Sequence, residues 1–535
     1  MRRPGYLSLI ILILSAVVWY SYYKTSFSSL VLNDAMDYAS ISRNILRGEG
    51  LISSYITPLG LANIKGLPHH DLWRAPFWPI VLSFFLKFFG NTDQAVAIGT
   101  GFFYIIGSVM VFLLGRELFD ETIGITSAFI YIFSAQNLDY SVSGMTEAFS
   151  VFMMLLTVYL LVASWTQNKW GDVLAGLAAG LFYLTRYNAL LFIPFMAVFL
   201  WFRRHTDGPA VYGKNHKNTH PRFWKVVRFL TSFVIVISPW LIRNYLITGN
   251  PFFSLQKFEL AMFTSIYPEY RLYTMMDNVN VADFIKTYPQ EIWAKVAAGW
   301  NEFWSSLLSP KVTGVDRSLF ILFCLSIFIP FENKFKGRLT GVKALLAACF
   351  VIQLSALLLI HFIYRLFFIF FPFYIIFGVA ALVWFLKVIA ERFPKGGDRF
   401  VGICLVAMTG FFIISNLPVW GLGAGGNTPI KDLRESVKAV TDMSSRKQLI
   451  LSNDGHLLAW YGDRYAAKLP FRTDMITQIE KLAPVNIIYL SGRMSWNAPE
   501  VDDSWRKVFW GKPKELYDFR LVGKFDDGSL IYVRR

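Results

Sequence analysis

The sequence predicts an α-helical polytopic membrane protein that ends in a small α/β domain. Of the 535 residues, 55% are hydrophobic and only 16% are charged, which excludes an ordinary soluble protein. Apolar runs of near-spanning length recur along the first four fifths of the chain. The last fifth has frequent charges and short apolar runs, and this change predicts a folded domain outside the membrane.

About eleven apolar segments approach the roughly 20 residues that cross a bilayer, so we expect about 11–13 transmembrane helices. The segments are 6–23, 95–114, 122–137, 147–165, 171–185, 188–203, 225–244, 317–331, 340–361, 366–387 and 399–416. Residues 77–90 are apolar but too short to span, and we expect an interfacial or re-entrant helix there. The three cysteines lie within spans, where packing is their expected role.

The distribution of Lys and Arg predicts which side of the membrane each loop occupies. If the start of the chain is cytoplasmic, the basic loops after the sixth, eighth and tenth spans also lie inside. These loops hold Arg203, Arg204, Lys214, Lys217, Arg222, Lys334, Lys336, Arg338, Lys387, Arg392, Lys395 and Arg399. Much of the net charge of +16 therefore reflects membrane topology, and we expect no nucleic-acid partner. The first span lacks a small-residue cleavage pattern, which favours a membrane anchor, and we expect a multi-pass protein of the cell inner (plasma) membrane.

Two regions follow from this topology. Residues 1–422 are the expected transmembrane domain, with outer loops 24–76 and 245–316 and a short surface helix near 281–288. After a Gly-rich linker at 422–429, residues 427–535 are the expected soluble extracytoplasmic α/β domain. Strands are predicted at 448–452, 485–490 and 530–533, and helices at 430–443 and 474–482. The region has no nucleotide-binding or zinc-protease motif, so a lid or acceptor-contact role is expected.

The first outer loop carries a pair of carboxylates, Asp34 and Asp37, just outside the bilayer. Their i, i+3 spacing places both on one face of a helix, and Arg43 and Arg47 follow on neighbouring turns. One interpretation is a solvated amphipathic helix on the membrane surface. The other is a general base for chemistry at the outer face. The residue types alone favour the two equally.

Further ionisable residues occur where other spans emerge at the same face, and such residues are often functional. They are Glu147, Arg186, Arg243, His361 and Arg365. A single arginine at a helix end often snorkels to the interface. Three arginines outside run against the positive-inside trend, however, and phosphate is the natural anion for their guanidinium forks. A base beside a phosphate clamp predicts group transfer from a lipid phosphate.

The motifs in chain order resemble those of a known enzyme class. They are Asn33-Asp-Ala-Met-Asp-Tyr-Ala-Ser-Ile-Ser-Arg-Asn-Ile-Leu46, Trp73-Arg74-Ala-Pro-Phe-Trp-Pro79, Thr146-Glu147, Leu184-Thr-Arg186 and Pro239-Trp-Leu-Ile-Arg-Asn244. Residues 1–420 resemble the GT-C polytopic glycosyltransferases of the protein O-mannosyltransferase and lipid A aminoarabinose transferase branch. The tail resembles in position the soluble domain of bacterial members.

The resemblance implies inverting transfer of a sugar from a polyprenyl-phosphate donor to an extracytoplasmic acceptor. It assigns catalysis to Asp34, whose neighbour here is Asn33 where many members have a second acid, with Asp37 and Arg74 at the substrate. Partial burial is expected to raise the pKa of Asp34 towards useful base strength. Arg186, Arg243 and Arg365 are expected to stabilise the departing phosphate. Glu147 is expected either to hold Arg186 or contact the sugar, or else to cap its own helix.

His69-His70-Asp71 in the first outer loop forms a separate candidate site. Two histidines and an aspartate could ligate a divalent metal, but adjacent histidines point in different directions and no fourth ligand is evident. Contact with the sugar or the acceptor is the favoured interpretation for His69 and His70. The sequence requires no cofactor, and a divalent metal remains an open alternative.

Two other classes compete with an enzyme. A transporter or flippase for a lipid-linked or anionic solute would also carry outer arginines, but it should show internal repeats and charges at mid-membrane. No clear repeat is present, and the polar residues cluster at the outer edge. An inactive scaffold would tolerate Asp34→Asn. The sugar and the acceptor, whether glycolipid, glycan or protein, cannot be read from the sequence.

Overall fold

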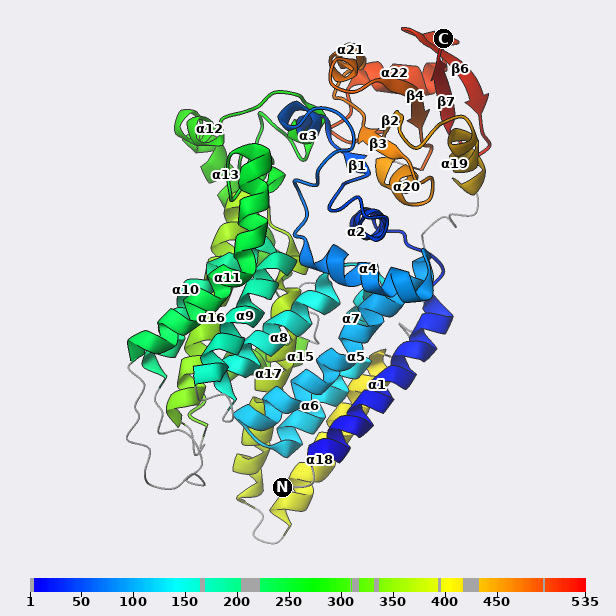
Figure 1. Ribbon diagram of the computed structural model, residues 1–535. Helices are drawn as coiled ribbons and strands as arrows, with labels where there is room; N and C mark the ends of the chain where they lie inside the picture. The colour runs from blue at the N-terminus through cyan, green and yellow to red at the C-terminus, as the bar shows by residue number, and fades with distance from the viewer. Residues whose placement is uncertain are drawn as a thin grey trace.

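The computed structural model describes residues 4–163, 169–203, 222–307, 309, 317–331, 336–392, 396–416, 433–493 and 496–535. The predicted linker at 422–429 and most of the basic loop at 204–222 lie outside the described residues, as do Lys334 and Lys395. The fold consists of a helical bundle with a mixed α/β domain at one end (Figure 1).

The helices of the first half are α1 (Pro4–Ser26), α2 (Asn33–Leu46), α3 (Pro58–Asn63), α4 (Phe77–Phe89), α5 (Asp93–Leu118), α6 (Glu121–Phe133), α7 (Ala135–Val142), α8 (Glu147–Val162), α9 (Lys169–Thr185), η2 (Tyr187–Phe192), α10 (Ile193–Phe202) and α11 (Arg222–Thr248). Those that follow, up to the α/β domain, are η4 (Leu255–Leu260), η5 (Arg271–Thr274), α12 (Val281–Thr287), α13 (Pro289–Ser306), α15 (Arg317–Ser326), α16 (Lys336–Ile360), η6 (Tyr364–Phe370), α17 (Phe371–Ala390) and α18 (Gly397–Asn416). Each predicted span contains a helix, and the predicted surface helix near 281–288 is α12.

Five described helices are long and apolar enough to cross a membrane by themselves. They are Gly5–Ser26, Asp93–Leu118, Arg222–Thr248, Leu339–Ile360 and Tyr364–Ala390. The pair α7 and α8, bent by 110°, makes a sixth if it is counted as one span. The apolar helices α4, α6, α9 and α15, and η2 continued by α10, have only 10–17 residues each. The protein is therefore a multi-pass membrane protein in which several apolar helices are shorter than a standard span.

Helix α4 lies across the end of the bundle (Figure 1). It buries Trp78, Leu82 and Leu86 against the bundle and exposes Phe84 and Phe88. A helix with one buried and one exposed apolar face fits the interfacial position that its length predicted.

Helices α9 and α11 approach closely through Gly176 and Gly180, a small-xxx-small pair on α9. A methyl group at Gly176 would lie 2.2 Å from the carbonyl oxygen of Phe229, and one at Gly180 would lie 2.7 Å from Val236. Small residues allow two membrane helices to pack backbone to backbone. This contact brings the C-terminal ends of α9 and α11, with Arg186 and Arg243, to the same end of the bundle.

The C-terminal domain is built on a seven-stranded sheet with the order β1-β3-β2-β4-β7-β6-β5. Its strands are β1 (Tyr55–Ile56), β2 (Leu449–Ser452), β3 (Tyr465–Lys468), β4 (Val485–Leu490), β5 (Glu515–Leu516), β6 (Phe519–Lys524) and β7 (Leu530–Arg534). Its helices are α19 (Leu433–Asp442), α20 (Gly455–Trp460), η8 (Thr473–Met475), α21 (Ile476–Glu480) and α22 (Asp503–Gly511). The predicted strands are β2, β4 and β7, whereas β3, β5 and β6 were missed because they are short or half-exposed.

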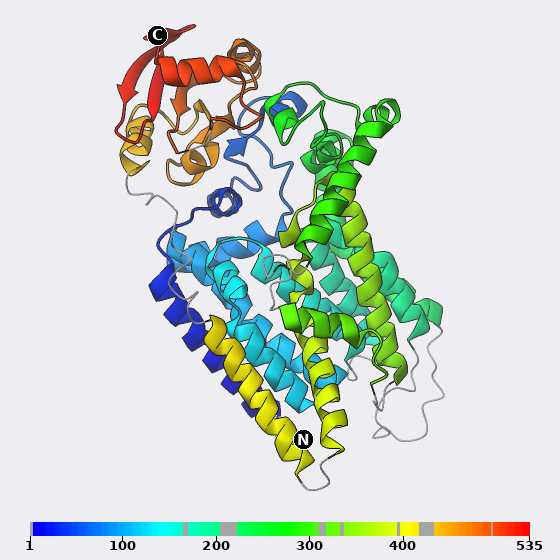
Figure 2. The ribbon, with the colours of Figure 1, turned by 180° about the vertical axis from the view of Figure 1, so that it is seen from behind.

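The edge strand β1 comes from the first outer loop, more than 390 residues before its partner in sequence. Tyr55 pairs in parallel with Ala466, and Ile56 pairs with Ala467. Ile52, Ile56 and Leu61 of the loop share one apolar core with the sheet. The loop and the C-terminal domain therefore fold as one unit above the bundle, as Figure 2 shows from behind.

Candidate active site

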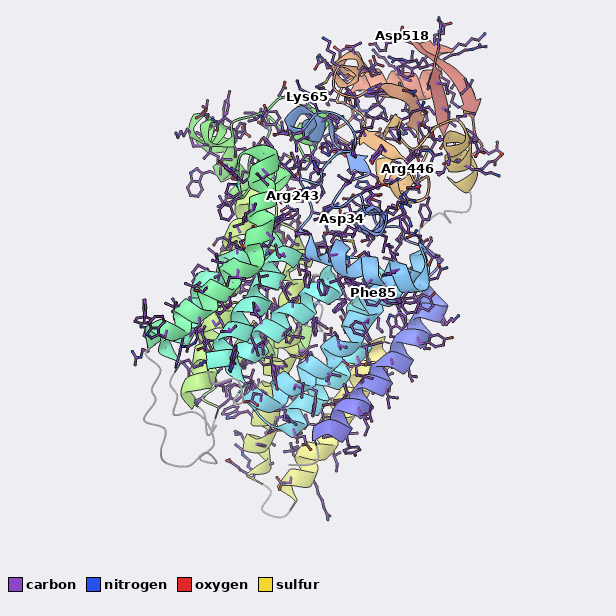
Figure 3. The ribbon with its side chains drawn as sticks, viewed as in Figure 1. Asp34, Lys65, Phe85, Arg243, Arg446 and Asp518 are labelled. Carbon is purple, nitrogen blue, oxygen red and sulfur yellow. The ribbon has the colours of Figure 1, made fainter. Side chains whose placement is uncertain are left out.

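The first outer loop positions Asp34 at the start of α2, at the boundary between the bundle and the α/β domain (Figure 3). Asp34 and Asp37 lie one turn apart, as their spacing predicted. The Asp34 side chain is 24% exposed, whereas that of Asp37 is buried. Asp34 is thus the carboxylate of the pair that a substrate can reach.

Arg74 joins the two carboxylates. Its Nη2 donates to Asp34 Oδ1 at 2.8 Å, and its Nε donates to Asp37 Oδ2 at 2.6 Å. Its guanidinium also lies over the rings of Tyr38, at 5.0 Å, and Trp73, at 5.2 Å. A planar fork between two acids and two aromatic faces is rigid. Arg74, known to the sequence only as part of a motif, is the centre of the site.

Arg365, at the start of η6, donates from Nη2 to the other oxygen of Asp34 at 2.6 Å. Burial by itself would raise the pKa of Asp34, but Arg74 and Arg365 outweigh it and hold that pKa well below its ordinary value. The expectation of a raised pKa for Asp34 is therefore wrong in direction, because the sequence could not show two arginines on one carboxylate. Burial does raise the pKa of Asp37, which shares only Arg74.

Glu147 and Arg186 form a second pair, where α8 begins at the 110° bend after α7. Arg186 Nη2 donates to Glu147 Oε1 at 2.6 Å and to Thr146 Oγ1 at 2.7 Å, and Nε donates to Ser150 Oγ at 2.9 Å. Of the roles expected for Glu147, holding Arg186 is the one these contacts support. The field of Glu147 reaches Arg365 and Tyr38, so this pair borders the Asp34 cluster.

Arg243 differs from the other outer arginines because, among the described residues, no carboxylate lies within ion-pair distance of it. It donates to the carbonyl oxygens of Asp71, at 2.8 Å, and Leu51, at 3.4 Å, and stacks over Trp240 at 4.6 Å. The Asp71 carboxylate accepts the backbone N–H of Arg74 at 3.0 Å. Arg243 thus supports the turn that presents Arg74, and the field of the Asp71 carboxylate reaches it without a direct ion pair.

The two adjacent histidines face different surroundings. His69 is buried and its pKa falls to about 4 through that burial, whereas His70 is exposed. Asp71 is engaged with the backbone N–H groups of Trp73 and Arg74. In the part of the chain that the structure describes, no group of three His, Cys, Asp or Glu side chains could hold a metal ion. Among the described residues, no hydrogen bond or ion pair joins either histidine to Asp34, so their predicted contact with the sugar or the acceptor stays a prediction.

Residues of the second predicted outer loop, 245–316, also border the Asp34 cluster, which the sequence did not predict. His361 stacks face to face on Phe263, with ring centroids 3.7 Å apart. Glu259 accepts from the hydroxyl of Tyr273 at 2.8 Å, and its field reaches Arg74 and Asp34. Burial raises the pKa of Glu259 to about 7. No motif marks Glu259, because only the folded loop brings it to the cluster.

The chain resembles known proteins in one segment of its sequence and in its fold. The family model described as dolichyl-phosphate-mannose-protein mannosyltransferase matches residues 73–242. No curated protein sequence matches the chain.

Several solved structures share its architecture. Archaeal oligosaccharyltransferase AglB from Archaeoglobus fulgidus has a TM-score of 0.61 at 12% identity, covering 98% of this chain and 80% of its own. ArnT from Cupriavidus metallidurans in the apo state has a TM-score of 0.57 at 11% identity, covering 98% and 97%. Arabinofuranosyltransferase AftD from Mycobacteria has a TM-score of 0.50 at 12% identity, covering 98% of this chain but only 41% of its own.

The chain has the fold of the GT-C glycosyltransferases. The structural likenesses establish the fold, and the family match over residues 73–242 contains Arg74, Glu147 and Arg186 of this chain. Asp34, Arg243 and Arg365 lie outside the matched segment, so their roles rest on the geometry described above.

Proposed function

We propose that this protein is a glycosyltransferase that transfers a sugar from a polyprenyl-phosphate donor to an extracytoplasmic acceptor with inversion, and that Asp34 is its catalytic base. The observation that carries the proposal is the partly exposed Asp34 carboxylate between Arg74 and Arg365. The matching family is described by a dolichyl-phosphate-mannose donor, and the AglB structure holds a dolichol-phosphate and an inhibitory peptide.

The low pKa of Asp34 requires an exchange of partners before it can act as a base. Arg365 is the more exposed of its two arginines, with 36% of its side chain exposed against 8% for Arg74. We propose that the donor phosphate draws Arg365 away from Asp34, because a phosphate accepts the same fork. Loss of one guanidinium raises the basicity of Asp34 and frees its Oδ2 for the acceptor.

The chemical step replaces one bond to the anomeric carbon of the sugar with another. The acceptor oxygen or nitrogen bonds to the anomeric carbon while the bond from that carbon to the phosphate oxygen breaks. The polyprenyl phosphate leaves with the bonding electrons, and Asp34 takes the acceptor proton. Arg365 and Arg243 stabilise the charge that develops on the phosphate. Arg74 holds Asp34 against the attacking face throughout.

The membrane orientation belongs to the same proposal. We place the site at the extracytoplasmic face of a plasma membrane, the inner membrane of a bacterial cell. The Lys and Arg distribution supports this placement, because basic loops favour the cytoplasmic side and the site lies at the opposite end of the bundle. The donor would reach the site laterally from the bilayer.

The test uses cells that lack the gene and express either the wild type or Asp34→Asn at equal membrane levels. Mass spectrometry of their glycolipids and glycoproteins should show one glycan that the wild type restores. Asp34→Asn should reduce it by about a hundred- to ten-thousandfold, the contribution of a general base. Asp283→Asn, an exposed residue of α12, is the matched control and should restore the glycan fully. Full restoration by Asp34→Asn would refute the proposal.

A further inference from the structure

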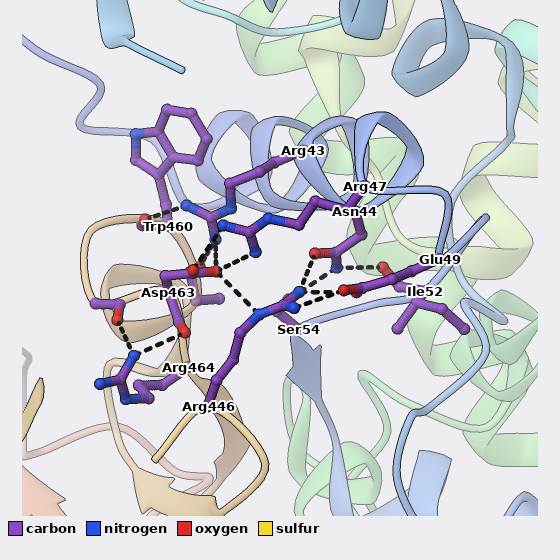
Figure 4. Close-up of polar contacts among 12 residues, drawn as sticks. Arg43, Asn44, Arg47, Glu49, Ile52, Ser54, Arg446, Trp460, Asp463 and Arg464 are labelled. Carbon is purple, nitrogen blue, oxygen red and sulfur yellow. Dashed lines mark hydrogen bonds and ion pairs between the residues drawn. The ribbon is translucent and has the colours of Figure 1, made fainter. Parts of the chain in front are cut away.

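The C-terminal domain binds helix α2, which carries Asp34, through hydrogen bonds and ion pairs in a cluster of charged side chains, shown in Figure 4. We call this cluster the α2 clamp; its members are Arg43, Arg47, Glu49, Arg446 and Asp463. The residues come from the end of α2, the turn after it and two loops of the C-terminal domain.

Asp463 is the centre of the clamp. Its carboxylate accepts both terminal nitrogens of Arg47, at 2.8 and 2.7 Å, and pairs with Arg43 Nη2 at 3.0 Å. Arg446 Nε lies 3.5 Å from the same carboxylate. Asp463 also has a φ of +51°, a conformation that Asp and Asn tolerate better than most residues. A carboxylate that gathers three guanidinium groups couples its loop strongly to α2.

Arg43 extends these contacts to the backbone of the C-terminal domain, and Arg446 extends them to side chains at the end of α2 and in the turn after it. Arg43 is buried, and its terminal nitrogens donate to the carbonyl oxygens of Trp460, at 2.7 Å, and Ala459, at 2.5 Å, at the end of α20. Arg446 binds both oxygens of Glu49, at 2.5 and 2.7 Å, and Asn44 Oδ1 at 3.1 Å. Arg43 and Asn44 both belong to the last turn of α2, so the clamp fixes the helix by its C-terminal end.

The entry to α2 is tied to the same domain by a second set of contacts. Asp93, the first residue of α5, accepts from Trp460 Nε1 at 2.6 Å and from the Tyr461 hydroxyl at 2.8 Å. It also accepts the backbone N–H of Leu30, just before α2, at 3.3 Å. Helix α2 is therefore held before its start and at its end by residues that meet at α20.

These contacts bear on Asp34 because no side chain caps the first turn of α2, although Ala35 and Met36 of that turn pack into the bundle core. The N-cap residue Leu32 offers no side-chain hydrogen bond, and the partners of Asp34 come from other elements. A short helix behaves as one rigid body, so a shift at Arg43 is transmitted to Asp34. A displacement of about 1 Å at a reacting group can cost on the order of a hundredfold in rate.

We propose that Asp463 and Arg43 are positioning residues through which the C-terminal domain sets α2, and thereby Asp34, against Arg74 and Arg365. This inference rests on the proposed catalytic role of Asp34. The C-terminal domain then does more than cover the site. Its loop at Asp463, far from Asp34 in the sequence, determines the position of the Asp34 carboxylate.

The experiment compares Asp463→Asn with Asp503→Asn in the full chain. Asn tolerates the left-handed backbone of Asp463, so the first substitution removes the charge with little strain. Asp503 is 74% exposed on α22, far from α2, and pairs with Arg506 at 2.6 Å, so its substitution removes a comparable charge from the same domain. Two readouts are taken at equal amounts of folded protein: hydrogen–deuterium exchange of peptides covering 33–46, and the yield of the Asp34-dependent glycan.

We expect Asp463→Asn to speed exchange in 33–46 at least tenfold and to lower the glycan yield ten- to a hundredfold. Asp503→Asn should stay within twofold of the wild type in both readouts, and Asp463→Glu should regain part of the yield because it keeps the charge. Equal behaviour of Asp463→Asn and Asp503→Asn, with Asp34→Asn inactive, would overturn the inference alone. An active Asp34→Asn would instead overturn the proposed function, and the exchange readout needs no substrate to be interpreted.

Discussion

At the scale of single residues, the site is a set of guanidinium groups with unequal compensation. Arg74 shares two carboxylates, Arg186 has Glu147, and Arg365 shares Asp34. Arg243 binds only carbonyl and amide oxygens. The sequence predicted that Arg186, Arg243 and Arg365 would stabilise a phosphate, whereas the structure gives a carboxylate partner to Arg186 and Arg365 but, among the described residues, none to Arg243.

Because Arg243 has no carboxylate partner among the described residues, we expect it to bind the donor phosphate. Arg243→Gln should therefore weaken binding of undecaprenyl phosphate by about 10- to 100-fold, since a charge-assisted contact to phosphate is lost. Binding is measured on the purified chain in detergent by native mass spectrometry. Arg116→Gln, on α5 at the other end of the bundle, is the control and should bind as the wild type does. Equal affinity of the two variants would show that Arg243 supports only the turn at Asp71.

Glu259 predicts a pH dependence of stability. Its folded pKa of about 7 exceeds the ordinary value of 4.5, so the folded state holds a proton that the unfolded chain has released. The free energy of unfolding should therefore fall between about pH 4.5 and 7 and level off above, by about 1–3 kcal/mol. Thermal unfolding at pH 5 and pH 8 should show a smaller difference for Glu259→Gln than for the wild type. The same difference in both would assign the effect to other groups.

At the scale of elements, the ends of helices decide where charges meet. Helix α9 ends at Thr185, directly before Arg186, and α8 begins at Glu147 after the bend. The close α9–α11 contact at Gly176 and Gly180 fixes the outer end of each helix. The sequence revealed which residues lie at the outer edge, but it could not show that the bend would point Glu147 at Arg186.

This pairing predicts a strong stability effect. Glu147→Ala should lower the free energy of unfolding by about 3–5 kcal/mol, because Arg186 would remain as a largely buried, unpaired charge. The double variant Glu147→Ala/Arg186→Met should lose less than the sum of the two single variants. Unfolding in detergent measures all three, with Glu121→Ala, exposed at the start of α6, as the control. Additive losses would mean that the two side chains do not interact.

At the scale of the whole molecule, the two predicted regions are not separate in the folded chain. The sheet takes β1 from the first outer loop, and the α2 clamp joins the same loop to the C-terminal domain. The predicted boundary near residue 427 marks a change in composition along the sequence. The α/β unit of the folded chain includes residues from both sides of that boundary. Asp34 consequently lies where the bundle and the α/β unit meet.

Loss of β1 should therefore destabilise the isolated C-terminal domain. A fragment of residues 433–535 would expose the edge of β3 and part of the core that Ile52 and Ile56 cover, and an open edge favours aggregation. We expect a lower melting temperature and aggregation on size-exclusion chromatography, relieved when residues 49–63 are fused to the fragment. A monomeric fragment with an unchanged melting temperature after fusion would contradict this role of β1.

Local sequence patterns were sufficient to predict the class of fold and the residues available for chemistry. Hydrophobicity and segment length are local properties, so the apolar helices, the interfacial α4 and the strands β2, β4 and β7 could be predicted from them. The i, i+3 spacing of Asp34 and Asp37 likewise determined that they share a helix face.

The partners and charge states of those residues depend on contacts that form only in the folded chain. The pKa of Asp34, the partner of Glu147 and the clamp on α2 each depend on contacts between residues tens to hundreds of positions apart. The Coulombic energy of two charges depends on their separation in space and on the dielectric between them, and not on their separation along the chain. For that reason the sequence could name the charged groups, while folding alone set which charges neutralise one another and which remain for a substrate.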